Sequence, residues 1–172
     1  MADFPVYVIS LDADRYERTA ALLRAQGLVP ERVPGVDPET ARGDSRIAPL
    51  CRLICTDKTA AVGLAHVRLA EIFLQTGHKM CLVCEDDARI RSRACPALVE
   101  IARQAGEGWD IIRLIRQGVR RANCGPPVPT TAGSGSAAAY LLSGTGATKT
   151  IAMPILYHID IMHNSSYFRT LN

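Results

Sequence analysis

The segment Lys79–Ile90, with the sequence KMCLVCEDDARI, constrains the fold of this chain more than any other stretch. An unbroken run of five apolar residues leads directly into three carboxylates, Glu85, Asp86 and Asp87. A short apolar run bounded by charge is typical of a strand buried on both faces. Because open parallel sheets bind ligands beyond the carboxyl ends of their strands, the acidic triplet lies where a site is expected.

The triplet also indicates a bound cation. Three adjacent carboxylates repel one another unless something neutralises them. Since side chains alternate across a strand, we expect Glu85 and Asp87 on one side and Asp86 on the other. Two carboxylates on one face suit Mn²⁺ or Mg²⁺, with water and phosphate oxygens completing the shell. A solvated acidic turn is the competing interpretation, but such turns rarely follow directly on a core strand.

Composition and charge narrow the classes of function. A chain of 172 residues suits a single domain over 1–172, with its core at about 5–160. Its net charge of +3 is compatible with an anionic substrate or with peripheral association with an anionic membrane. Aromatic residues make up 5%, which leaves little to stack bases on, so we expect no nucleic-acid partner. The N-terminus resembles neither a signal peptide nor a membrane span, so we expect a cytoplasmic protein, at most peripheral at the inner face of the membrane.

The six cysteines fit reduced thiols in that compartment. The pairs Cys81 and Cys84, and Cys51 and Cys55, raise the possibility of a zinc site. Zinc ligands usually sit on tight turns, whereas Cys81 and Cys84 lie within the predicted strand and on its opposite faces. Core packing is therefore the preferred explanation.

The order of the expected elements predicts an α/β domain with a mostly parallel central sheet flanked by helices. Strands are expected at Val6–Leu11, Glu31–Val33, Met80–Cys84, Trp109–Ile115 and Ser136–Leu142. Helices are expected at about Tyr16–Gln26, Asp57–Thr76, Ala97–Ala105 and Gly144–Met153, with caps at Asp12 or Asp14, Thr56 or Asp57, and Ser143. Turn-forming residues predict loops at about 34–55 and 116–135.

Two further features are ambiguous from the sequence alone. Arg15 and Arg18 stand three residues apart in the first turn of a helix, where cations oppose the helix dipole, which suggests an anionic partner. Two solvated arginines would explain the pattern equally well. His66 falls on the apolar stripe of its helix, so a core histidine is the more usual interpretation and a functional one the lesser.

Four segments together resemble glycosyltransferase family 25, the lipooligosaccharide galactosyltransferase-like group that includes collagen galactosyltransferases. They are VYVISLDADRYER (6–18), TAAVGLAHVRLAEIF (59–73), CLVCEDDARI (81–90), and SAAAYLLSGTGATKTI (136–151) followed by HID (158–160). The chain departs from the family pattern at Ser10, which replaces an asparagine, and around His66. There the family usually carries Gly-Cys and then serine, whereas this chain has Ala61, Val62 and Ala65.

The resemblance implies a GT-A type fold and transfer of a sugar, most often galactose from UDP-galactose, to a saccharide acceptor with inversion. The setting would be lipopolysaccharide or cell-surface glycan synthesis. Manganese (or magnesium) would be held by the triplet in the role of a DxD motif and would neutralise the leaving diphosphate. The implied metal ligands are Glu85, Asp87, His158 and His163, and the implied donor contacts are Leu11, Asp12, Arg15, Arg18 and Asp86.

The resemblance also suggests Asp160 as the base that activates the acceptor hydroxyl, with His66 as the second choice. If the tail is extended, alternation places His158 and Asp160 on one side. A catalytically weak or inactive sugar-nucleotide-binding protein of the same fold is the first alternative, because the helix motif is altered. A haloacid dehalogenase-type phosphatase is the second, since Asp12-Ala-Asp14 follows the first strand. Its second acidic pair should come last, whereas here Glu85–Asp87 precedes Ser143 and Lys149, so motif order argues against it.

Overall fold

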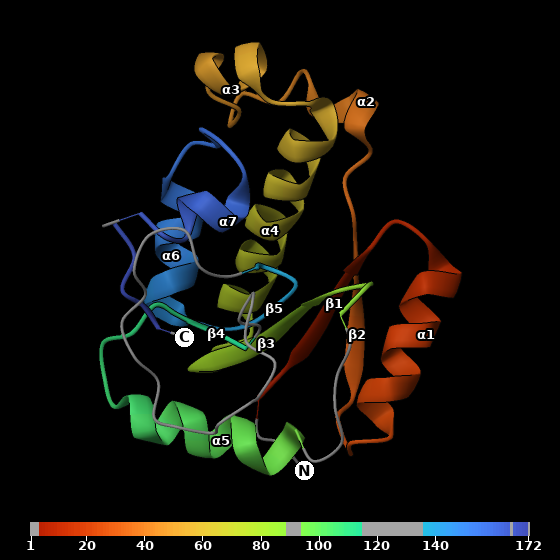
Figure 1. Cartoon of the computed structure of the whole chain (residues 1–172), viewed down its shortest axis with the longest axis vertical. Helices are drawn as coiled ribbons and strands as arrows, with labels where there is room; N and C mark the ends of the chain where they lie inside the picture. The colour runs from red at the N-terminus through yellow and green to blue at the C-terminus, as the bar shows by residue number, and fades with distance from the viewer. Residues whose placement is uncertain (1–3, 89–93, 115–135, 166, 172) are drawn as a thin grey trace.

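The computed structural model describes residues 4–88, 94–114, 136–165 and 167–171. In these ranges one sheet has the strand order β2-β1-β3-β5-β4-β6 (Figure 1). The strands are β1 Val6–Ser10, β2 Pro30–Pro34, β3 Met80–Glu85, β4 Ile111–Arg113, β5 Ala139–Ser143 and β6 Thr170–Leu171. The helices are α1 Ala13–Arg24, α2 Pro38–Ala41, α3 Pro49–Ile54, α4 Asp57–Gln75, α5 Ala94–Ala105, α6 Gly144–Ala152 and α7 Ile159–Met162.

The sheet is mixed, with β5 running against its neighbours. Strand β1 is parallel to both β2 and β3, and β4 is parallel to β6, whereas β5 is antiparallel to both β3 and β4. The chain passes from β1 to β2 on one side and then to β3 on the other, so the strand order reverses at β1. Such a reversal leaves a crevice beyond the carboxyl ends of the two strands that flank it, here β1 and β3.

Helices cover both faces of the sheet and make two hydrophobic cores. Alternation along β1 sends Tyr7 and Ile9 into one core and Val6 and Val8 into the other. The first core includes residues of α4, α6 and α7, and the second includes residues of α1 and α5 (Figure 1). This three-layer arrangement confirms the expected α/β class with a central sheet and flanking helices.

Three expected helix caps are confirmed, although α1 begins at Ala13, three residues before its predicted start. Asp12 accepts a hydrogen bond from the Arg15 amide, Thr56 from that of Thr59, and Ser143 from that of Gly146. Helix α5 begins at Ala94, three residues before the predicted start. Strand β4 covers three residues, fewer than the Trp109–Ile115 prediction.

Two sequence predictions about irregular segments were wrong. The segment predicted as a loop at 34–55 contains α2 and α3, both of which have proline in the first turn, where its missing N–H costs nothing. Helices this short show no periodicity. The expected extended tail instead forms α7, where His158 Nδ1 accepts from the Asp160 amide at 3.4 Å, so the alternation argument does not apply. The predicted loop at 116–135 lies outside the described residues.

The described cysteines agree with core packing. Cys81 and Cys84 are buried free thiols within β3, and burial raises the pKa of Cys84 to about 12. Cys51, on α3, is also a buried free thiol. Among the helices within the described ranges, none combines the length and the apolar character needed to cross a membrane.

Candidate functional site

Asp86 joins the carboxyl ends of β1 and β3. Its Oδ2 accepts a hydrogen bond from Ser10 Oγ at 2.7 Å, and its Oδ1 lies 2.5 Å from Arg15 Nη2. The main-chain oxygen of Asp86 accepts from Thr19 Oγ1 at 2.8 Å. Residues of β1 and α1 therefore hold this carboxylate at the point where the strand order reverses, and Arg15 balances its charge.

Glu85 points to the other face of the sheet from Asp86, where it contacts His66 of α4. His66 Nε2 lies 3.3 Å from Glu85 Oε1, and His66 Nδ1 lies 2.7 Å from the Tyr140 hydroxyl. Because an ionised carboxylate can only accept, His66 Nε2 carries a proton. Burial pushes the pKa of Glu85 upward, but the hydrogen bond and charge of His66, with His158 and Arg15, outweigh it and lower this pKa. Glu85 is therefore ionised near neutral pH.

Asp87 is the member of the triplet that has no partner within the described ranges. It is exposed in the turn after β3, and it makes no hydrogen bond or ion pair with any residue that the structure describes. Glu85 and Asp86 were expected to point to opposite faces of the sheet. This is confirmed, because Glu85 contacts α4 and Asp86 contacts α1. The strand ends at Glu85, so alternation does not determine the side on which Asp87 lies.

Asp160 is held where α7 meets the start of β5 and the end of β4. Its Oδ1 accepts from the Ala137 amide, and its Oδ2 lies 3.1 Å from His158 Nδ1. Arg113 Nη2 donates to the Asp160 main-chain oxygen at 2.6 Å, and Arg113 Nη1 lies 3.9 Å from Oδ1. The Asp160 side chain is 27% exposed, so its carboxylate is fixed and still open to solvent.

Sequence reasoning missed Arg113. Its side chain is 1% exposed, and Nε and Nη1 have no hydrogen-bond partner in the described part of the chain. Burial lowers the pKa of this guanidinium, although the charge of Asp160 opposes the shift. A charge between the apolar residues of Ile111–Ile115 was the available signal, because a cation inside a core strand is rare without a function or a partner.

His163 lies behind this network rather than at its surface. It is buried, and its ring contacts those of His66, Tyr140 and Phe168 at centroid distances of 5.2 to 6.3 Å. Burial, with the charges of His66 and Arg113, holds the pKa of His163 well below 6.5. Its Nε2 has no partner among the described residues.

The remaining predicted donor contacts gather at the junction of β1 and α1. Leu11 is 59% exposed, and Asp12 caps α1 through the Arg15 amide, which lowers the Asp12 pKa. The charges of Arg15 and Arg18 lower it further, so both cations lie near Asp12. Arg32 adds a third cation there, since its Nη2 donates to the main-chain oxygen of Leu11 at 2.8 Å.

The described residues do not form a preformed metal cage. They contain no group of three His, Cys, Asp or Glu side chains placed to hold an ion, and the predicted set of Glu85, Asp87, His158 and His163 makes no such group. Mg²⁺ and Mn²⁺ often bind through one or two carboxylates and the phosphates of a substrate. Asp87, which has no partner among the described residues, fits that mode, so the metal stays a prediction with Asp87 as its first ligand.

A hollow of about 440 Å³ lies elsewhere, between α3 and the start of α4. It is lined by Arg42, Ile47, Cys51, Arg52, Cys55, Thr56, Asp57 and Ala60, none of which belongs to the sheet-edge site.

Comparison with known proteins adds no family assignment: no protein-family model matches the chain, and no curated protein matches it. The resemblance to glycosyltransferase family 25 rests on the four sequence segments.

Proposed function

We propose that the chain binds a nucleotide sugar beyond the carboxyl ends of β1 and β3 and transfers the sugar to a saccharide acceptor. The observation that carries this proposal is the meeting of Ser10 and Arg15 with Asp86 where the strand order reverses. The four-segment resemblance supports it and makes UDP-galactose the first donor to test. The GT-A fold belongs to the same proposal.

The junction of β1 and α1 is suited to a diphosphate. Arg15 and Arg18 lie in the first turns of α1, and arginine binds phosphate oxygens through charge-assisted hydrogen bonds. Asp87 would hold Mn²⁺ or Mg²⁺ between the protein and the phosphates, and that ion would neutralise charge on the leaving diphosphate. Arg15 has the further role of balancing Asp86, so its pairing links the anion site to the end of β3.

Asp160 is the base in this proposal. Its carboxylate is held by the Ala137 amide beside His158, and it is open enough to accept a proton from an acceptor hydroxyl. His66 is buried with both ring nitrogens engaged, so its role is to position Glu85 rather than to touch substrate.

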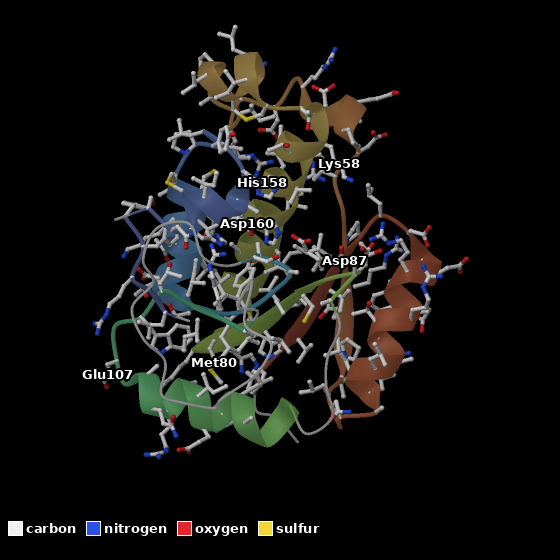
Figure 2. All side chains as sticks on the ribbon, viewed as in Figure 1. Lys58, Met80, Asp87, Glu107, His158 and Asp160 are labelled. Carbon is white, nitrogen blue, oxygen red and sulfur yellow. The ribbon has the colours of Figure 1, made fainter. Side chains whose placement is uncertain are left out.

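The deciding experiment measures UDP release from UDP-galactose with Mn²⁺ and a panel of saccharide acceptors. Asp87→Asn should lower the rate about a hundredfold, because the metal would lose its protein ligand. Glu107→Gln is the matched control, since Glu107 is also an exposed carboxylate and lies on the opposite side of the molecule from Asp87 in the view of Figure 2. Equal rates for both variants would contradict the role of Asp87 as metal ligand, and no UDP release from the unchanged protein would contradict transfer.

Binding without transfer is the second candidate. It is favoured by the pairing of Glu85 with His66 and of Asp86 with Arg15, which leaves one carboxylate of the triplet free in the described structure. Saturable binding of labelled UDP-galactose with no UDP released across the acceptor panel would identify this case.

A further inference from the structure

Two thiols meet at the end of α3. Cys51 lies in this helix and Cys55 is its C-cap, and the Cys55 amide donates to the Cys51 main-chain oxygen at 2.8 Å. Both residues line the 440 Å³ hollow between α3 and the start of α4. Cys51 is buried, whereas Cys55 is half-buried. Cys55 is therefore the thiol of this pair that a solute in the hollow reaches.

The two side chains contact each other. The Cys51 thiol is hydrogen-bonded to Cys55, and burial together with that bond raises the pKa of Cys51 to about 12. A hydrogen bond that raises the pKa of a thiol favours its protonated form, so Cys51 is the donor and the Cys55 sulfur the acceptor. The pair is asymmetric, with a buried protonated thiol beside a more accessible one.

The end of a helix permits a disulfide at this spacing. Residues four apart on a helix have Cβ atoms about 5–6 Å apart, and a disulfide brings them to about 3.5–4.5 Å, so the last turn must tighten slightly. Cys55 has left the helical conformation, with φ −94° and ψ 152°, so no further helical turn opposes that movement. Cys81 and Cys84 lack this arrangement, because they lie on opposite faces of β3 in different cores.

We propose that Cys51 and Cys55 form an oxidation site at which hydrogen peroxide converts the two thiols into a reversible disulfide. The Cys55 thiolate attacks one peroxide oxygen, the O–O bond breaks, and the hydroxide that leaves is protonated to water. The Cys51 sulfur then attacks the Cys55 sulfenic acid and loses its proton as the S–O bond breaks and a second water leaves. The thiols lose two electrons, which reduce the peroxide to water. The proposal does not depend on the transferase activity.

Peptide mapping of the full chain tests this site, because trypsin cuts after Arg52, between the two cysteines. After exposure to hydrogen peroxide and blocking of the remaining thiols, peptides 47–52 and 53–58 should be joined, and dithiothreitol should separate them. Peptide 80–89, which contains Cys81 and Cys84, is the matched control in the same digest. The joined pair should form about tenfold faster than a disulfide within peptide 80–89, since both thiols of β3 are buried.

Two variants separate the roles of the thiols. Cys55→Ser should leave Cys51 reduced, because the accessible thiol is gone. Cys51→Ala should leave the Cys55 sulfenic acid without its partner, so labelling of Cys55 by dimedone should rise about tenfold over the unchanged protein. Melting temperatures of both variants, measured without peroxide, check that the chain stays folded.

Three results would overturn the proposal. The first is oxidation of peptide 80–89 as fast as joining of 47–52 to 53–58. The second is oxidation of Cys55 in the unchanged protein to sulfinic acid with no bond to Cys51. The third is a joined pair found only in covalent dimers on a non-reducing gel, since the bond would then link two copies of the chain. The mapping of the unchanged protein decides all three, whether or not the variants fold.

Discussion

Among single residues, His163 makes stability depend on pH. Its pKa lies well below 6.5 in the folded chain because it is buried. The unfolded chain therefore binds a proton that the folded chain does not, and stability present above about pH 6.5 is lost as the pH falls. The loss attributable to His163 should approach about 1.4 kcal/mol for each pH unit.

Urea unfolding between neutral pH and about pH 5.5 measures this loss. His163→Phe should make the dependence shallower, because phenylalanine fits beside Tyr140 and Phe168 without titrating. His78→Gln, at an exposed histidine, is the control substitution. Identical slopes for the unchanged protein and His163→Phe would refute the assignment.

The sequence was informative about residues whose neighbours are local. The caps Asp12, Thr56 and Ser143 depend on contacts within three residues, and they were predicted. The partners of the acidic triplet were not, since Glu85 meets His66 across layers and Asp86 meets Ser10 over 76 positions. One sequence without aligned relatives contains no signal for such distant pairs.

At the scale of elements, a glycine of α6 packs against the main chain of Asp110, the residue before β4. A Cβ at Gly146 would lie 2.2 Å from the main-chain oxygen of Asp110, which has no room to move because the Ser143 amide donates to it. Gly146→Ala should therefore destabilise the protein by about 3 kcal/mol. Gly144→Ala is the control, since nothing lies within 4 Å of a Cβ there. Chemical denaturation of both variants checks the prediction, and comparable stability would disprove the close packing.

The direction of β5 could not be predicted from the sequence, although the strand itself was. Its apolar sequence predicted a strand, but an apolar strand looks the same whether it runs parallel or antiparallel to its neighbours. Helix α7 was missed for a related reason, since Ile159 and Ile161 alternate as in a strand over a span too short to show a helical period. The long, capped elements α4 and α6 were predicted within a few residues.

For the whole molecule, we expect UDP and Mn²⁺ to bind cooperatively. UDP should raise the melting temperature when Mn²⁺ is present and have little effect with chelator, because the diphosphate and Asp87 repel each other without a cation between them. Differential scanning fluorimetry with UDP, Mn²⁺ and both measures this coupling. The same rise with and without chelator would show that Arg15 and Arg18 suffice for binding.

The antiparallel strand β5 also has a consequence for biosynthesis. It forms the bridge between β3 and β4, so the hydrogen-bonding edge of β3 is complete only when residues 139–143 have been made. A nascent chain that has already paired β1, β2 and β3 therefore exposes an apolar edge while more than fifty further residues are translated. Covering that edge during the interval, for instance by a chaperone, should reduce aggregation of the nascent chain.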